Sequence, residues 1–494
     1  MTIVKYKVVA SPRTLPEINT PRQGLTAYAA FVVHIVRSGI ADIKEVTAFK
    51  PALLDPTHRF FQNAANSHSP FETHEGFRCG FTNPPVTPRD REVQAKDLFS
   101  FSISAAIPLV EMGAHHSVMD ILGDGQATPR AKGYAREAFV NLTLEAANRD
   151  RLVQDDGDYL LMKLLADPDA TRSTKEDAAM ALANLTADTA NHLRLNFAGV
   201  HKSLMDLLDD QQATHGEKES AARALTHLVL NTENQPFLLQ EGVHISLCLL
   251  LLDPHATHGA KEDAAKALAN LTADTANHPL LVRDDVHKSL MYLLDDPHAT
   301  HRAKEDAAKA LANLTANTAN HQRLTLAGVH NSLRDLLDDP QATHGAIENA
   351  ARALANLTLT TEKHPLLLQD AVHIRLMALL DDPHATPVAK EDAARELANL
   401  TLTTEKHPLL FDAGVHKSLM NLIDDPHATP GAIENAARAL ANLTLTTEKH
   451  PLLIQDGVHI RLMELQDNQK ATDSAKGYAT TALAALNCSQ VGLM

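Results

Sequence analysis

A repeat of 43 residues is the feature that most constrains this chain. The stretch from Ala260 to Arg302 reads AKEDAAKALANLTADTANHPLLVRDDVHKSLMYLLDDPHATHR, and the next stretch begins AKEDAAKALANLTANTANH at Ala303. Asn270 and Asn313 fill the same slot of this pattern, 43 residues apart. A single unit of this length cannot bury its own apolar face, whereas stacked units share a continuous core. The sequence therefore predicts a quasi-linear solenoid.

The asparagine slot returns along most of the chain. It lies in an A-N-L-T or V-N-L-T setting, and His227 fills the one slot without it. The further asparagines of this series are Asn141, Asn184, Asn356, Asn399 and Asn442. Every step between members is 43 residues or a multiple of 43. We therefore expect nine regular units, with altered first and last copies that share the sequence AKGYA.

Each unit contains three helical patterns and no strand pattern. The first is short, Thr275–Asp284, and the second, Val286–Leu294, has an apolar stripe with the 3.6-residue period of a helix. A DDPHAT loop separates them from the third, Ala303–Thr315, which Thr300 is placed to cap. The predicted inner face of the third helix is mostly small, so that successive third helices can approach closely. This face consists of Ala307, Ala310, Leu311 and Leu314.

These three patterns resemble the armadillo repeat. The residues that carry the resemblance are A-x-A-L-A-N-L-T in the third helix, T-A-N-H-x-x-L at the first and A-G-V-H-x-S-L-x-x-L-L at the second. They recur over about four-fifths of the chain, with a loop before the third helix about two residues longer than usual. The resemblance implies an all-α fold, a right-handed superhelical α-solenoid of three-helix repeats.

The chain divides by composition into two parts. Residues 88–494 carry the repeats, and residues 1–87 hold seven of the 13 phenylalanines. The segment Leu53–Asn66 resembles a worn copy of the repeat, so residues 1–87 are interpreted as degenerate capping repeats. The alternative is a separate N-terminal region with an enzymatic or targeting activity, to which the solenoid brings a substrate.

Charge and cysteine content limit the location and the partners. A net charge of −16 disfavours a nucleic-acid or anionic-membrane binder, and the longest leucine-rich run, Leu247–Leu252, is too short to cross a bilayer. The N-terminus lacks the apolar core of a secretory signal, and only three cysteines are present. We expect an intracellular protein, cytoplasmic or nuclear, with no nucleic-acid partner and no membrane insertion.

The third helices carry the candidate binding residues. In armadillo proteins the third-helix asparagine holds the main chain of an extended ligand, and a tryptophan four residues earlier forms pockets for lysines. The resemblance implies this peptide-binding role for Asn184, Asn270, Asn313, Asn356, Asn399 and Asn442. The chain has no tryptophan, and beyond Met180 that position is cationic, with Arg223, Lys266, Lys309, Arg352, Arg395 and Arg438.

Amides pair with an extended backbone, and cations select carboxylate or phosphate groups. The pattern resembles the basic groove of beta-catenin more than the groove of importin-alpha. We therefore predict a non-enzymatic adaptor or scaffold that binds an extended, acidic or phosphorylated protein segment. The alternative is purely structural: Asp263 and Lys266 are spaced to brace their own helix, and the amides could tie neighbouring helices together.

Histidines and aspartates form two further rows. Histidine recurs at two slots per unit, represented by His278 and His287, and aspartate pairs such as Asp295–Asp296 recur in the loops. Equivalent histidines in stacked helices lie about 8–10 Å apart, too far to share an ion. We therefore expect helix-end, surface histidines and solvated loop aspartates, and we leave open a pH response and contact with a basic partner. No catalytic residue, metal site or cofactor is predicted, because no nucleotide-binding, nucleophile or zinc motif is present.

Overall fold

The structure is a computed structural model that describes residues 87–358 and 372–491. Across these residues the chain forms helices and turns and no strand. It divides into two compact units, Met1–Asn191 and His192–Met494, and we describe each by itself. The predicted boundary between residues 87 and 88 stays a prediction, because the residues before 87 lie outside the described part.

The first unit contains the opening repeats. Its elements are α4 (Pro88–Glu111), α5 (Ala114–Gly123), α6 (Pro129–Leu144), α7 (Ala146–Gln154), α8 (Gly157–Ala166), α9 (Arg172–Thr186) and η3 (Thr189–Asn191). Thr87 caps α4 in a capping box with Asp90, and Pro88 occupies the first turn, where no amide hydrogen is needed. Ala105 has non-helical torsion angles, so α4 bends there. The part before the bend corresponds to a third helix, and the part after it to a first helix.

The second unit continues the same three-helix order. Its first helices, with the 3₁₀ turns that lead into them, are α10 (His192–Phe197), α13 (Gln235–Gln240), η4 (Thr275–Asn277), α16 (His278–Arg283), η5 (Thr318–Asn320), α19 (His321–Leu326), η7 (Thr404–Lys406), α25 (His407–Ala413), η8 (Thr447–Lys449) and α28 (His450–Gln455). Its second helices are α11 (Val200–Asp209), α14 (Val243–Leu252), α17 (Val286–Asp295), α20 (Val329–Leu337), α23 (Val372–Asp381), α26 (Val415–Asp424) and α29 (Val458–Asp467). Its third helices are α12 (His215–Leu228), α15 (His258–Leu271), α18 (His301–Thr315), α21 (His344–Leu357), α24 (Pro387–Leu400), α27 (Pro430–Leu443) and α30 (Asp473–Val491).

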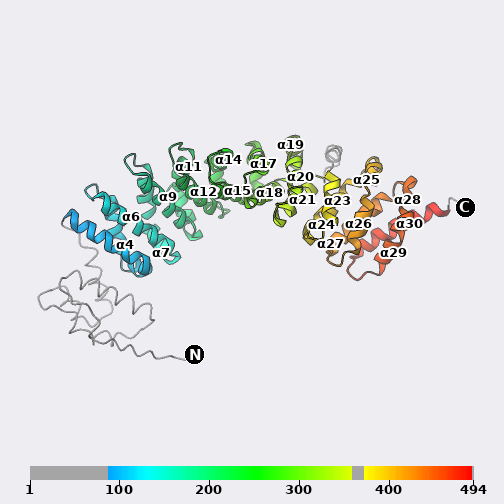
Figure 1. Cartoon of the computed structure of the whole chain (residues 1–494), viewed down its shortest axis with the longest axis horizontal. Helices are drawn as coiled ribbons and strands as arrows, with labels where there is room; N and C mark the ends of the chain where they lie inside the picture. The colour runs from blue at the N-terminus through cyan, green and yellow to red at the C-terminus, as the bar shows by residue number, and fades with distance from the viewer. Residues whose placement is uncertain (1–86, 359–371, 492–494) are drawn as a thin grey trace, which may run out of the picture. The chain divides into compact units, whose positions relative to one another are not determined.

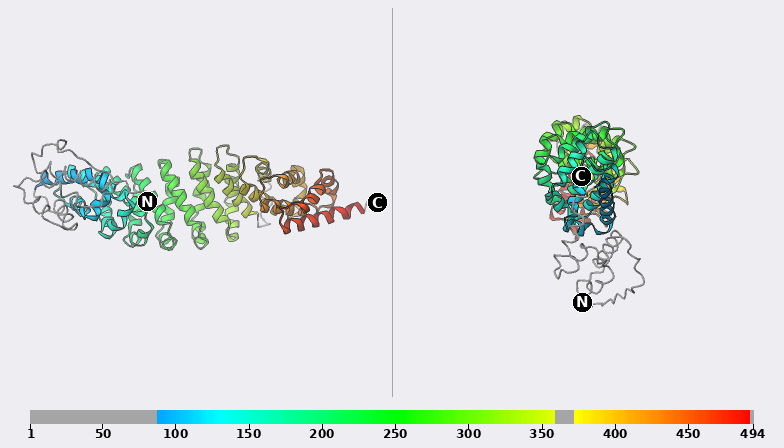
Figure 2. Two further views of the ribbon diagram at one scale, coloured as in Figure 1. Left: turned by 90° about the horizontal axis from the view of Figure 1, so that it is seen from below. Right: turned by 90° about the vertical axis from the view of Figure 1, so that its left-hand side faces the viewer.

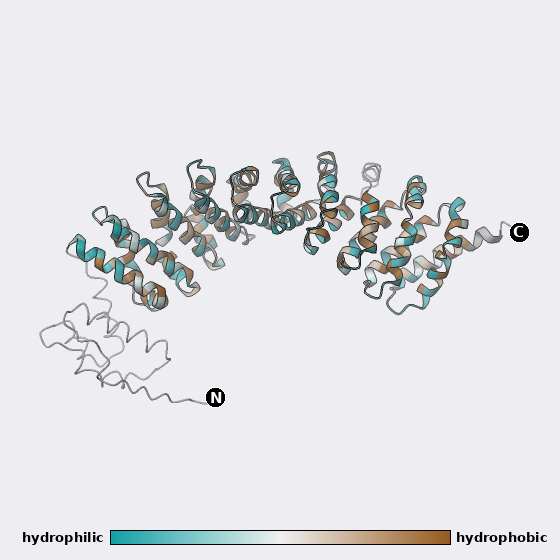
Figure 3. Ribbon diagram, in the orientation of Figure 1, coloured by the Kyte–Doolittle hydropathy of each residue, from teal (hydrophilic) through white to brown (hydrophobic). Residues whose placement is uncertain are grey.

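The third helices form the spine of the second unit. From α12 to α30, consecutive third helices pack against one another, and Figures 1 and 2 show them in chain order. Small residues make this approach possible, since Ala307, Ala310, Leu311 and Leu314 of α18 are all fully buried. Figure 3 shows hydrophilic and hydrophobic residues on the same helices, as expected when one face of each packs inward. The predicted inner face of the third helix is confirmed.

Side chains also join each third helix to the following repeat. Thr343 caps α21 by accepting from the backbone N–H of Ala346, and its hydroxyl donates to Glu305 on α18 over 2.5 Å. Lys304 of α18 lies 3.2 Å from Asp339 in the next loop. The cap therefore serves two repeats at once, because its hydroxyl is both an acceptor and a donor.

This arrangement corrects the prediction for the second aspartate of three of the five pairs, Asp296, Asp339 and Asp425. The second aspartate is ion-paired with a lysine of the preceding third helix, and its side chain is at most 24% exposed. The ion pairs are Lys261–Asp296, Lys304–Asp339 and Lys390–Asp425, and Lys218 pairs in the same way with Asp253, a single aspartate that follows Leu252. These aspartates are not solvated turn residues, because the repeat stacking places a cation beside each of them.

In the described part of the chain, no single helix is long and apolar enough to cross a membrane. The helices Pro88–Glu111 and Ala114–Gly123 meet the length and composition criterion only when they are joined across a 110° bend.

Candidate functional site

The recurring asparagines bridge neighbouring third helices. Asn313 on α18 donates through Nδ2 to the carbonyl oxygen of Ala269, 3.2 Å away, and lies 3.3 Å from the hydroxyl of Thr272, both on the preceding repeat. The same pair of acceptors, the equivalent alanine carbonyl and threonine hydroxyl, recurs for Asn356, Asn399 and Asn442. In the first unit, Asn184 donates to the hydroxyl of Thr143 over 3.0 Å. The amide hydrogens of these residues are therefore used inside the solenoid.

Asn270 departs from the series. Its Nδ2 is buried and has no hydrogen-bond partner among the described residues. The preceding repeat has Val229 at the place where other repeats have the threonine, so the hydroxyl acceptor is missing. Where the repeat after an N-L-T triplet keeps the asparagine, the threonine of the triplet is thus the partner of that asparagine, a role that was not assigned from the sequence.

The side-chain oxygen of each asparagine, Oδ1, is the atom that could still accept a hydrogen bond from a ligand. Asn399 is buried, and its Oδ1 accepts from Arg438 over 3.2 Å, so both ends of this amide are engaged. Asn313, Asn356 and Asn442 are half-buried, and Oδ1 has no partner among the described residues. For the amide hydrogens, these contacts match the structural alternative, in which the asparagines tie neighbouring helices together. A peptide would meet the side-chain oxygens only.

The cation row lies beside the amides on the same helices. Arg223, Lys266 and Lys309 are exposed, and Arg352, Arg395 and Arg438 are half-buried. Arg223 pairs with Glu219 on its own helix and lies 3.5 Å from Asp263 on the next, and Arg395 pairs with Asp392 over 2.5 Å. Lys266 and Lys309 have no partner within 4.0 Å in the described part of the chain.

Aspartates on the same helices partly neutralise this row. Burial raises the pKa of Asp263, Asp306 and Asp392, and the neighbouring cations oppose that rise. Asp306 faces Lys309 of its own helix and Lys266 of the preceding one. The aspartate is replaced by asparagine on α21 and α27, where Arg352 contacts Asn349 over 2.5 Å. The positive charge is therefore concentrated at Arg352, Arg395 and Arg438, with Asp392 as the one acid at this slot.

At the two recurring slots the described histidines are buried, apart from His459, which is half-buried, so the prediction of surface histidines is wrong. His278 and His287 are fully buried at the starts of α16 and α17, and only the helix-end part of the prediction is confirmed. At the first slot the ring donates to a local backbone carbonyl: Nε2 of His278 lies 2.8 Å from the carbonyl oxygen of Thr272, so Nε2 carries the proton. Burial lowers the pKa of His201, His321, His373 and His407. The same cause lowers the pKa of His287 to about 4.

One polar cluster was missed by the sequence analysis. His115, His116 and Asp155 of the first unit bring their ligand atoms within 4.8 Å of one another. The adjacent pair His115–His116 is visible in the sequence, but its aspartate lies 40 residues further on. Only the stacking of the repeats places that carboxylate beside the two rings.

Comparison with known proteins supports the fold. No protein-family model and no curated protein matches the sequence. A crystallographically characterised engineered protein is 23% identical, with a TM-score of 0.68 over 83% of this chain and 98% of its own. A designed armadillo repeat protein is 28% identical and covers 49% of this chain and 98% of its own, with a TM-score of 0.44.

The order of the helices and the packing of each repeat on its neighbours define the class. The protein is an all-α tandem-repeat solenoid with armadillo-like units of three helices. The predicted fold class is confirmed at this level, and the right hand of the superhelix stays a prediction.

Proposed function

We propose that this protein is a non-enzymatic adaptor whose second unit binds an extended, acidic or phosphorylated segment of a partner protein. The single observation that carries the proposal is the cluster of Arg352, Arg395 and Arg438 on three consecutive third helices, with one aspartate at the neighbouring slot. Guanidinium groups form strong, bidentate contacts with carboxylates and phosphates. The intracellular location, cytoplasmic or nuclear, is part of the same proposal.

The amides take a smaller part than the resemblance implies. Oδ1 of Asn313, Asn356 and Asn442 is an acceptor, so it would receive a backbone N–H of the peptide. Lys266 and Lys309 extend the cation row toward the N-terminal side, although Asp263 and Asp306 weaken their field. The arginine cluster is therefore the part of the row that would discriminate between charged and uncharged peptides.

Repeat spacing fixes the length scale of the ligand. Packed helices lie about 8–10 Å apart, and an extended chain rises about 3.2–3.4 Å per residue. Successive arginines would thus meet side chains about two to three residues apart. Peptides with phosphoserine at every second or every third position, and their serine counterparts, are the matching probes.

The test compares binding of these peptides to the whole protein and to a variant with Arg352→Glu and Arg438→Glu. We expect the phosphorylated peptide to bind more tightly than its serine counterpart. The double variant should lose at least about tenfold in affinity, because each charged hydrogen bond contributes about 1.5–3 kcal/mol. Fluorescence anisotropy at fixed ionic strength gives both numbers.

The matched control reverses two cations of second helices, Lys288→Glu and Lys417→Glu. Both side chains are 61% exposed and each pairs with one aspartate. This control changes the net charge by the same amount as the arginine variant. Equal losses in the two variants would mean that general electrostatics, and not the third-helix cluster, drives binding. Unchanged affinity in the arginine variant would refute the proposal.

A further inference from the structure

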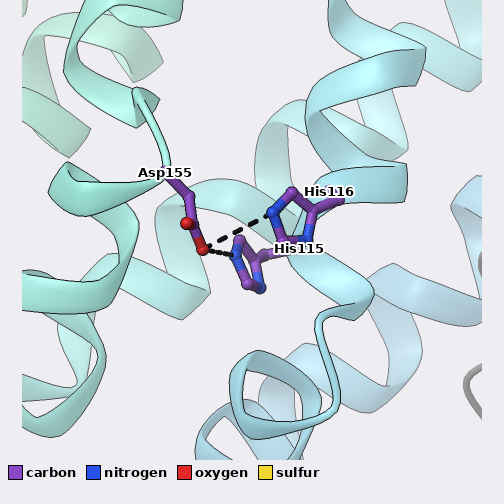
Figure 4. A group of neighbouring side chains, drawn as sticks. All are labelled: His115, His116 and Asp155. Carbon is purple, nitrogen blue, oxygen red and sulfur yellow. Dashed lines mark hydrogen bonds and ion pairs between the residues drawn. The ribbon is translucent and has the colours of Figure 1, made fainter.

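Two histidines and an aspartate meet between α5 and α7 in the first unit. Figure 4 shows both rings directed at the carboxylate of Asp155. Nε2 of His115 lies 2.7 Å and Nε2 of His116 lies 3.5 Å from the same oxygen, Oδ2. His115 and His116 open α5, and Asp155 follows the last residue of α7. The cluster therefore links a second helix to the first helix of the next repeat.

The hydrogen bond at the far side of His116 fixes its tautomer. Nδ1 lies 3.0 Å from the carbonyl oxygen of Gly113, which can only accept, so Nδ1 carries the proton. A neutral His116 then presents the lone pair of Nε2 to an anionic carboxylate oxygen. Two acceptors face each other unless a cation lies between them. A ring N–H donated to a backbone carbonyl is also the arrangement that orients histidine ligands in metal sites.

Comparison with other repeats shows what His116 adds to the His115–Asp155 contact. The pairs His244–Asp284 and His416–Asp456 reproduce His115–Asp155, at 3.0 Å and 2.8 Å, with the same 40-residue separation. The residue after the histidine is Ile245 in one repeat and Lys417 in the other. The histidine–aspartate pair is thus a recurrent structural contact, and the second imidazole is particular to the cluster at His115.

We propose that His115, His116 and Asp155 form a binding site for a divalent transition-metal ion such as Zn²⁺ or Co²⁺. Two imidazole nitrogens and one carboxylate oxygen are a donor set that suits these ions. His115 is fully buried, while the side chain of His116 is 49% exposed, so the remaining coordination positions face solvent. The bound ion would link the start of α5 to the end of α7.

Two local groups must adjust for the ion to bind. Nε2 of His115 now donates its proton to Asp155, and metal binding releases one proton from this nitrogen. Arg151 pairs with Oδ2 of Asp155 over 2.6 Å, but its side chain is 56% exposed and can turn into solvent. The ion replaces the positive charge that Arg151 and the imidazole proton supply to the carboxylate.

The test is a Co²⁺ titration of the whole protein, followed by the visible absorption of the coordinated ion. The variant that removes the site is His116→Lys, which introduces the residue type that follows His416 in another repeat. We expect one equivalent of Co²⁺ to bind the protein and the variant to bind at least about tenfold more weakly, a loss that even outer-shell changes cause in metal sites. Competition by Zn²⁺ should remove the absorption.

A gain-of-site variant covers the case in which His116→Lys does not fold. Ile245→His places a second imidazole beside the His244–Asp284 pair, after Gly242, which takes the same left-handed conformation as Gly113. We expect a second equivalent of Co²⁺ with the same absorption. Equal Co²⁺ binding by the protein and His116→Lys would overturn the proposal, and so would the absence of any coordinated-ion absorption in the protein.

Discussion

Asn313 shows how a single side chain joins two repeats. Its Nδ2 meets a backbone carbonyl and the hydroxyl of Thr272, and the threonine in turn donates to the carbonyl of Ala269. The asparagine and threonine of one N-L-T triplet therefore face opposite neighbours. This division of roles explains why the two residue types recur together, and it makes the exceptions in the series informative.

The first prediction concerns the missing acceptor of Asn270. Replacing Val229 by threonine supplies a hydroxyl of nearly the same shape at the place where other repeats have one. We expect Val229→Thr to raise the free energy of unfolding by about 1 kcal/mol, because a buried Nδ2 gains its hydrogen bond. Urea unfolding followed by circular dichroism measures the change.

The matched control for this substitution is Thr272→Val in the next repeat. It removes the acceptor of Asn313 and should lower the free energy of unfolding by about 1–3 kcal/mol. If both substitutions destabilise the protein equally, the hydroxyl–amide contact is not the reason that threonine recurs.

A second residue-scale prediction concerns Glu396, which occupies an alanine slot of the third helix. Glu396 is fully buried, and neither carboxylate oxygen has a hydrogen-bond partner among the described residues. Burial raises its pKa well above the usual value. We expect Glu396→Ala to stabilise the protein by about 1–3 kcal/mol at neutral pH, since it removes an unpaired buried polar group.

The stability gain of Glu396→Ala should depend on pH in a definite direction. A carboxyl with a raised pKa in the folded protein binds more protons than in the unfolded chain, so stability falls as pH rises above about 4.5. The advantage of Glu396→Ala should therefore grow with pH in thermal unfolding. The reciprocal change, Ala353→Glu, should destabilise the protein. A variant no more stable than the parent would contradict this account of Glu396.

The residue-scale contacts were only partly predictable from the sequence. The asparagine and cation rows follow from the 43-residue period, because equivalent residues of stacked units must align. The partner of each amide does not follow, since it depends on the register between two helices, which the period leaves free. The asparagines at positions 349 and 435 are visible in the sequence, but their effect on the charge of the row needs the neighbouring helices.

At the scale of elements, the second helices begin with buried histidines. His287 lies in the first turn of α17 and is fully buried, and neither ring nitrogen has a hydrogen-bond partner among the described residues. The charged groups that face it are Asp285, Lys288 and Arg323. The sequence alone favours a surface position for a polar ring at a helix end. The histidine recurs at the same slot, next to Val286 and one turn before Leu290, and this regularity indicates that the ring packs with the apolar stripe.

Burial of His287 predicts acid sensitivity. Its pKa falls from 6.5 to about 4 in the folded protein, so the unfolded chain binds more protons between these values. The contribution of the neutral His287 ring to the free energy of unfolding is then fully present above pH 6.5 and is lost as pH falls toward 4. For this residue alone we expect a loss of about 2 kcal/mol between pH 7.5 and 5. Urea unfolding at the two pH values measures it.

The variant His287→Gln removes the titrating ring and should unfold with a shallower pH dependence, even if it is less stable at neutral pH. His298→Gln is the control, because His298 is exposed in the loop that follows α17. A slope that stays the same in His287→Gln and in the control would show that burial of this ring does not set the acid sensitivity.

Element boundaries were predicted well where a local cap defines them. The helix from Val286 was placed correctly, because a left-handed residue, Asp285, must precede it and an Asp–Pro loop ends it. The third helix begins at His301, two residues before the predicted start, since Thr300 caps it directly. The short first helix is preceded by a 3₁₀ turn, Thr275–Asn277, which a helical period cannot distinguish from an α-helical start.

At the scale of the whole molecule, a cationic row exists on a chain of net charge −16. Acidic residues lie in the loops and on the third helices, and four loop aspartates are paired with a cation of the preceding repeat. An acidic peptide would thus be attracted by the arginine cluster at contact distance and repelled by the chain as a whole at longer range. The two effects differ in range, so ionic strength separates them.

The last prediction uses this difference. The Debye length is about 30 Å at 0.01 M and about 10 Å at 0.1 M ionic strength. Raising the salt from about 0.01 to 0.1 M should screen the net repulsion and speed association of an acidic peptide, whereas higher salt should weaken the contacts and speed dissociation. We therefore expect the affinity to pass through a maximum near about 0.1 M. Stopped-flow binding gives both rate constants, and a steady fall in affinity from the lowest salt upward would show that the acidic surface is not felt at the arginine cluster.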